Sequence, residues 1–190
     1  MSLPSFPQGE GDPLQEALKY VESLERKVVE IKGDGNCLFC ALAFLVYGTE
    51  DVRIQMRELL ADFISRNKVQ FAKLTDKIDE HILKLKYQRV WGSALELQAI
   101  ASLLQLPVYT LLPNHEGTYK WVIYNPQDDT TLDFPLEPPP PRSLSSLDHL
   151  ELINVHSCHY NCIVDLLGHS PLTRPPLQPT ELSELSDPPK

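Results

Sequence analysis

The chain has 190 residues, of which 42% are hydrophobic and 23% charged. This length and composition predict one globular domain with tails. The 17 basic and 26 acidic residues give a net charge of −9. Because phosphate binding requires dense basic patches, we expect no nucleic acid as a partner. An acidic protein instead suits a basic partner.

The sequence lacks the signals that would direct it to a membrane or out of the cell. No apolar run approaches the roughly 18 residues of a membrane span, and the first residues lack the basic and apolar segments of a secretion signal. We therefore expect an intracellular, cytoplasmic protein that works as a monomer and binds no membrane. In that reducing compartment its four cysteines are expected to be free thiols.

Prolines mark the limits of the predicted domain, since five of the 17 fall within residues 135–141 and six within 171–189. Segments poor in large apolar side chains do not order. We therefore expect a flexible start at residues 1–11, a folded domain at 12–168 and a disordered, proline-rich tail at 169–190. Proline cannot continue a central strand or helix, so residues 135–147 are expected to form a surface loop.

Helical patterns dominate the first half of this domain. Asp12 is a favoured helix cap and Pro13 a favoured first residue. Gly48 ends the second predicted helix, and Ser93 with Glu96 has capping-box spacing for the last one. The expected helices are 13–24, 36–47, 51–64, 76–85 and 93–104, with a short strand at 28–31.

Strand patterns dominate the second half. Runs of β-branched and aromatic residues predict strands at 108–112, 121–124, 150–155 and 160–165. Early helices and late strands together predict an α+β domain in which helices flank a small sheet.

A glycine-rich turn precedes Cys37 in the motif GDGNCLF. A thiol at the start of a helix lies at the positive end of the peptide dipoles, which favours its thiolate. The glycines allow successive backbone N–H groups to converge on an oxyanion formed when the thiolate attacks a carbonyl. Cys37 is therefore a candidate nucleophile. The alternative is a buried structural cysteine.

A second motif, CHYN, places His159 two residues before Asn161. Histidine can accept the thiol proton and later deliver it to a leaving amine. Residues i and i+2 of a strand share a face, so Asn161 can accept a hydrogen bond from the imidazole and orient it. The alternative is a histidine that is only hydrogen-bonded within a partly buried strand.

The same residues raise a third possibility, a zinc site formed by Cys37, Cys40, Cys158, His159 and Cys162. Against it, Cys40 lies in an apolar helix, where it suits the core. In a straight strand His159 and Cys162 also point to opposite faces. A redox pair of Cys37 and Cys40 would need a βαβ pattern around it. We therefore expect no metal and no cofactor.

Three motifs in order, GDGNCLF, WGSALELQAIASLLQLPVYTL and HYN, resemble the ovarian-tumour (OTU) family of cysteine proteases over residues 14–167. The resemblance implies a papain-type fold with a small, mostly antiparallel sheet. It also implies hydrolysis of isopeptide or peptide bonds at the carboxy terminus of ubiquitin or a ubiquitin-like protein. Cys37 would then be the nucleophile and His159 the general base and acid. Asn161 matches the third triad position, and Asp34 an active-site acid that orders the nucleophile loop or assists the oxyanion region.

Trp91, Gly92 and Glu96 match the family's central motif. We expect structural roles for them, Glu96 as a cap and Trp91 in the core or as a wall of the substrate groove. The chain has WGS where many members have WGG, and Cys40 where arginine is common. The acidic chain suits the basic tail of ubiquitin. The alternatives to a deubiquitinase are an inactive ubiquitin-binding module and a zinc-stabilised interaction domain.

Overall fold

A computed structural model describes residues 11–116, 118–126, 138–141, 147–167 and 171. Almost all of the predicted flexible start and of the predicted tail, and most of the predicted proline-rich loop, lie outside these residues. The elements in chain order are α1 (Pro13–Ser23), β1 (Arg26–Val29), α2 (Cys37–Tyr47), α3 (Arg53–Arg66), α4 (Lys68–Phe71), α5 (Ile78–Leu85), α6 (Ala94–Leu104), β2 (Val108–Pro113), β3 (Tyr119–Tyr124), β4 (Leu150–Val155) and β5 (His159–Asp165).

One five-stranded sheet organises the molecule, with the strand order β1-β5-β4-β2-β3. Three of the four strand pairs are antiparallel, and only β2 and β4 run parallel. The expected α+β domain with a mostly antiparallel sheet is therefore confirmed. Because β5 lies between β1 and β4, the strand that begins with His159 is held on both sides.

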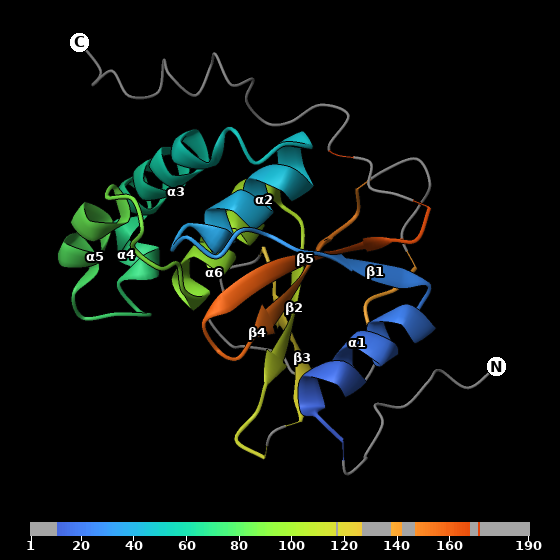
Figure 1. Cartoon of the computed structure of the whole chain (residues 1–190). Coiled ribbons are helices and arrows are strands. Elements are labelled where there is room, and N and C mark those ends of the chain that lie inside the picture. The colour runs from blue at the N-terminus through green and yellow to red at the C-terminus, as the bar shows by residue number, and fades with distance from the viewer. Residues whose placement is uncertain (1–10, 117, 127–137, 142–146, 168–170, 172–190) are drawn as a thin grey trace.

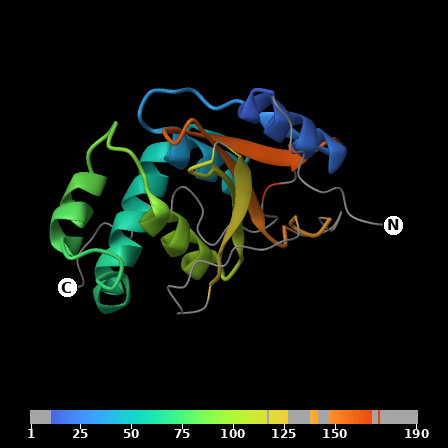
Figure 2. The same ribbon diagram turned by 90° about the horizontal axis from the view of Figure 1, so that it is seen from below.

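Helices cover both faces of this sheet (Figure 1). On one face α1 packs its buried Ala17, Tyr20 and Val21 against β3, β4 and β5. On the other face α2, α3 and α6 form the larger core. Seen from below, α5 lies far from the strands, beyond α3 (Figure 2). Among the described residues, no helix is long and apolar enough to cross a membrane.

Helix α2 is the central helix of the larger core. It is apolar almost throughout and ends at Gly48, whose left-handed φ of 78° closes the last turn. The buried Cys162 thiol of β5 donates a hydrogen bond to the Ala41 carbonyl at 3.4 Å. This contact holds the first half of α2 against β5.

Most predicted elements are present, and the differences have physical causes. The first strand spans Arg26–Val29 rather than 28–31, because the Ile31 N–H bonds to the Asn161 side chain instead of to a neighbouring strand. The single turn α4 was not predicted, since four residues carry no periodic signal. The predicted capping box of Ser93 and Glu96 is present.

Leu42 lies in the middle of α2 and is fully buried. We expect Leu42→Ala to lower the free energy of unfolding by about 2–5 kcal/mol, because it leaves a cavity in the core. Leu83→Ala is the matched control, since Leu83 of α5 is 64% exposed, and its expected effect is within about 0.5 kcal/mol. Urea denaturation measures both, and equal effects would contradict this description of the core.

Candidate active site

Cys37 is the first residue of α2 and is 7% exposed. The turn before it depends on Gly35, whose φ is +84°. A Cβ atom at Gly35 would lie 3.0 Å from the Cα and carbonyl oxygen of Arg89. The predicted glycine turn is therefore present, and it places the Cys37 thiol at the positive end of the helix dipole.

His159 begins β5 and is oriented by Asn161. The Asn161 side-chain oxygen accepts a hydrogen bond from the His159 Nε2–H at 2.9 Å. The same oxygen accepts a second bond from the Ile31 N–H, also at 2.9 Å. With the proton on Nε2, the neutral imidazole keeps its lone pair on Nδ1. The hydrogen bond predicted between these two side chains is present.

The loop that leads to Cys37 passes beside this imidazole. A Cβ atom built on Gly33 would lie 3.6 Å from both Nδ1 and Cε1 of His159. The acceptor side of the ring therefore faces a backbone segment that ends at Cys37, four residues later.

Burial raises the pKa of Tyr160, and a hydrogen bond with Asn154 opposes this rise. The two motifs are separated by most of the domain in sequence, yet they meet at this site.

Asp34 orders the loop before Cys37. Its Oδ1 atom accepts a hydrogen bond from the Asn36 backbone N–H at 2.9 Å. Partial burial acts to raise the pKa of Asp34, but hydrogen bonds from the Asn36 backbone and side chain, together with the positive charges of Arg53 and Lys32, outweigh it, so the pKa is lowered. Of the two roles expected for Asp34, these contacts correspond to ordering of the loop.

The central motif covers the Cys37 loop from the other side. A Cβ atom at Gly92 would lie 2.4 Å from Leu38 Cδ2, so this close approach requires glycine. The expectation that Trp91 fills the core is wrong, since its side chain is 63% exposed. Gly92 is the residue that packs against Leu38, and Trp91 beside it projects outward. Its role as a wall of the groove stays a prediction.

Glu96 of the same motif is fully buried and structural, as expected. Its Oε2 atom accepts hydrogen bonds from the Ser93 backbone N–H at 2.6 Å and from the Ser93 hydroxyl at 2.9 Å. Its Oε1 atom pairs with His81 Nε2 at 2.5 Å. Glu96 thus caps α6 and ties it to α5. His81 was not predicted as a partner of Glu96, because its position in α5 does not distinguish it from an ordinary surface histidine.

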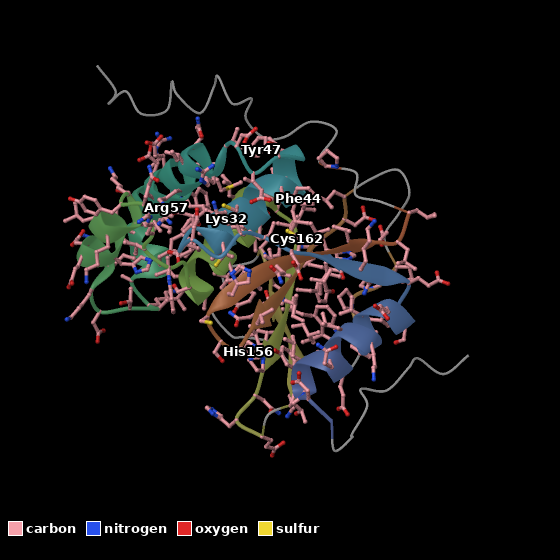
Figure 3. All side chains as sticks on the ribbon, viewed as in Figure 1. Lys32, Phe44, Tyr47, Arg57, His156 and Cys162 are labelled. Carbon is pink, nitrogen blue, oxygen red and sulfur yellow. The ribbon has the colours of Figure 1, made fainter. Side chains whose placement is uncertain are left out.

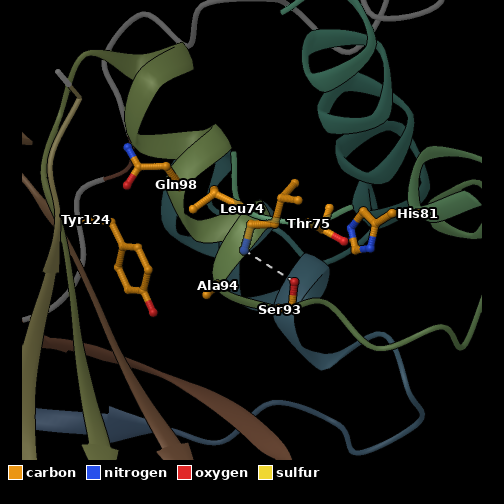
Figure 4. A pocket seen from close by; sticks show the side chains of 8 residues that line it. Leu74, Thr75, His81, Ser93, Ala94, Gln98 and Tyr124 are labelled. Carbon is orange, nitrogen blue, oxygen red and sulfur yellow. Dashed lines mark hydrogen bonds between the residues drawn. The ribbon is translucent and has the colours of Figure 1, made fainter. Parts of the chain in front are cut away.

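A pocket of about 280 Å³ opens beside this cap (Figure 4). It lies between α5, α6 and the end of β3. Its lining combines apolar side chains with a few polar ones, and consists of Leu74, Thr75, His81, Ser93, Ala94, Leu95, Gln98 and Tyr124. Ser93, which lines this pocket, directly follows Gly92 in the sequence. Cys37 and His159 are not among the lining residues.

The other cysteines differ from Cys37 in their surroundings. Cys40 is buried in α2, and burial raises its pKa to about 12. Cys162 is buried, whereas Cys158 is exposed. The interpretation of Cys40 as a core residue is confirmed. In the described part of the chain, no group of three or more metal-ligating side chains lies together.

Residues 32–150, more than half of the chain, match the family of OTU-like cysteine proteases. The chain belongs to this family. The matched segment contains Asp34, Cys37 and the central motif, and it ends before His159. The position of His159 beside the Cys37 loop therefore comes from the structure.

Known proteins resemble the chain in sequence and in fold. The OVARIAN TUMOR DOMAIN-containing deubiquitinating enzyme 6 of Arabidopsis thaliana is 28% identical over 94 residues, 48% of this chain and 18% of that protein. The chain thus spans less than a fifth of that relative. The OTU domain of OTUD1 has a TM-score of 0.63 at 20% identity, covering 81% of this chain and 95% of that one.

A ubiquitin-bound OTU deubiquitinase from Wolbachia pipientis wMel has a TM-score of 0.59 at 12% identity, covering 76% of this chain and 98% of that one. At 20% and 12% identity, the similarity to these two structures is a similarity of fold alone. The expected OTU-type fold is confirmed.

The His81–Glu96 pair predicts a pH-dependent stability. The hydrogen bond with Glu96 raises the pKa of His81, against an opposing effect of burial. Because the pKa of His81 is higher in the folded than in the unfolded protein, its protonation stabilises the fold. This stabilisation is fully present below the unfolded pKa of about 6.5 and is lost as the pH rises through the folded pKa.

We expect His81→Gln to lower the melting temperature more at about pH 6 than at about pH 9. Glutamine can still bond to Glu96, but it carries no charge. Thermal melts of both proteins across this range measure the difference. A constant difference would show that the His81 charge does not stabilise the fold.

Proposed function

We propose that this chain is a cysteine-type deubiquitinase, which hydrolyses isopeptide or peptide bonds at the carboxy terminus of ubiquitin or a ubiquitin-like protein. The observation that carries the proposal is the arrangement around His159. Asn161 bonds to Nε2 of the ring, and the acceptor atom Nδ1 faces the loop that ends at Cys37. A thiol at a helix start with an oriented base beside its loop is the arrangement that thiol catalysis requires.

In the proposed first half-reaction, His159 Nδ1 takes the proton from Cys37 and the thiolate attacks the carbonyl carbon of the terminal glycine. The carbonyl π electrons move to oxygen, and N–H groups at the start of α2 stabilise this oxyanion. When the intermediate collapses, the C–N bond breaks, and the leaving amine takes the proton from the imidazolium. The product is a thioester on Cys37.

In the second half-reaction, His159 removes a proton from water, which attacks the thioester carbonyl. The C–S bond breaks, the sulfur takes the proton back from the imidazolium, and the ubiquitin carboxylic acid leaves and ionises, so that Cys37 and His159 regain their starting states. Asn161 keeps the imidazole in the tautomer that both steps need. As a neutral amide it stabilises the imidazolium less than a carboxylate would.

Several features support ubiquitin as the substrate. The Arabidopsis relative is a deubiquitinating enzyme, and the Wolbachia neighbour is bound to ubiquitin. The net charge of −9 suits the basic ubiquitin tail. The exposed Trp91 offers apolar surface beside Gly92, which packs against Leu38 of α2. The free thiols fit a reducing compartment, which we propose to be the cytoplasm.

Labelling tests the nucleophile. We expect ubiquitin with a carboxy-terminal electrophile to form one covalent adduct, mapped to Cys37 by peptide mass spectrometry. Cys37→Ala should abolish the adduct, because Cys37 is the thiol at the start of α2 that the proposed mechanism uses. Cys158→Ala is the matched control, since Cys158 is exposed but lies in a turn, and it should label normally. A folded protein that binds ubiquitin without labelling or turnover would instead be an inactive binding module.

Turnover tests the base. We expect His159→Ala to lower kcat for a fluorogenic ubiquitin amide by about 10²–10⁴-fold, the usual contribution of general acid–base catalysis. His115→Ala is the control, because His115 is exposed in the β2–β3 turn. A His159→Ala enzyme with normal kcat would exclude the proposed mechanism.

A further inference from the structure

Arg57 of α3 is a charged side chain that is only 2% exposed, and it points from α3 toward the segment before α2 (Figure 3). Its guanidinium donates to the carbonyl oxygens of Leu85, at 3.1 Å, and Val90, at 2.9 Å. A third bond, at 2.9 Å, goes to the Asn36 side-chain oxygen. The guanidinium also lies 3.8 Å above the centre of the Phe39 ring. All three oxygens are uncharged, so this buried charge is held by dipoles.

A buried arginine with neutral acceptors costs free energy relative to an apolar residue of similar size. Burial lowers the pKa of Arg57, while the negative charges of Glu96 and Asp34 oppose this change. Core packing alone would not require a guanidinium at this position. The planar guanidinium, which makes three hydrogen bonds here, is instead suited to holding several chain segments in one geometry.

Asn36 connects Arg57 to the residue that follows it, Cys37. Asn36 is 5% exposed, and its side-chain oxygen accepts bonds from Arg57 and from the Arg89 backbone N–H, the latter at 3.0 Å. Its backbone N–H and its side chain both bond to the Asp34 carboxylate. Asn36 is therefore held on one side by an acid and on the other by a guanidinium.

This use of the Asn36 oxygen leaves the start of α2 uncapped. Asn36 occupies the N-cap position, where asparagine normally accepts a bond from the first helical N–H groups. Here its side chain makes no such bond, since Arg57 and Arg89 occupy the oxygen. The N–H groups beside Cys37 are therefore not taken by the residue that would ordinarily cap them.

We infer that Arg57 is a positioning residue for acyl transfer at Cys37. Acting through Asn36, it fixes the loop before Cys37 and keeps the Asn36 oxygen away from the N–H groups that receive the oxyanion. It also holds the Val90 carbonyl, and thereby the segment that leads to Gly92. This inference rests on the proposed function, because it assigns a role within that reaction.

Two reactions of Cys37 separate this role from a general effect on folding. Hydrolysis of a fluorogenic ubiquitin amide forms an oxyanion, whereas alkylation by iodoacetamide displaces iodide at a saturated carbon and forms none. Both are measured in a Cys158→Ser background, so that Cys37 is the thiol followed. Arg57→Lys keeps the charge but loses the planar set of donors. Arg66→Lys is the matched control, since Arg66 is exposed at the end of the same helix.

We expect Arg57→Lys to lower kcat by about 10–100-fold with KM within about threefold, as for loss of a transition-state interaction. Alkylation should stay within about twofold of the parent, because the thiolate itself is unchanged. Arg66→Lys should match the parent in both reactions. A normal kcat for Arg57→Lys, or alkylation that falls in parallel with kcat, would overturn the inference.

Asn36→Ala provides the second variant and covers the case in which Arg57→Lys does not fold. It should also lower kcat and spare alkylation, and a normal kcat would overturn the inference. If both variants fold, the double variant should be no slower than the slower single one, because Arg57 acts through Asn36. If the losses in kcat of the two single variants multiply in the double variant, Arg57 and Asn36 act independently, which would overturn the inference. A parent that alkylates but does not hydrolyse ubiquitin amides would refute the proposed function, and the inference with it.

Discussion

The site depends on one amide oxygen, that of Asn161, which accepts from both His159 and the Ile31 N–H. The first bond sets the tautomer of the imidazole. The second holds the chain just after β1 against β5, so that the next residues pass the ring and reach Cys37. A single buried acceptor therefore fixes both the orientation of the candidate base and the path of the loop that carries the candidate nucleophile. Its two donors come from segments about 130 residues apart in sequence.

A second buried amide, that of Asn36, fixes the residue directly before Cys37. There the partners are charged, Asp34 on one side and Arg57 on the other. Side-chain networks of this kind are costly when they are incomplete and rigid when they are satisfied. The loop before Cys37 is thus defined mainly by side-chain hydrogen bonds rather than by regular secondary structure, which suits a catalytic loop that must keep one geometry.

The sequence predicted much of this arrangement. Helix caps such as Asp12 and the Ser93–Glu96 box, and the glycine turn before Cys37, are local signals that survive in the fold. The hydrogen bond between His159 and Asn161 followed from strand spacing. Arg57 was missed, although it shares a helical face with Leu60, Ala61 and Ile64, at spacings that place it toward the core.

Other features could not be read from local patterns. The acceptors of Arg57 are backbone carbonyls 28 and 33 residues away, and backbone atoms carry no sequence signature. The exposure of Trp91 could not be predicted for the same reason. The residue of this segment that packs against Leu38 is Gly92, and this contact joins residues far apart in the sequence. Tertiary contacts decided both cases, and apolar composition alone pointed the wrong way for the tryptophan.

The strand order has a consequence for where the candidate base lies. Val108 of β2 pairs with Tyr124, the last residue of β3, and with Leu150, the first residue of β4, so the chain leaves β3 and enters β4 at the same end of the sheet. That entry point lies at the opposite end of β4 from Val155, which pairs with His159. At that other end, the short β4–β5 hairpin pairs Val155 with His159 and holds the imidazole in place. The candidate base is therefore a full strand length away from the end of the sheet at which β3 ends and β4 begins.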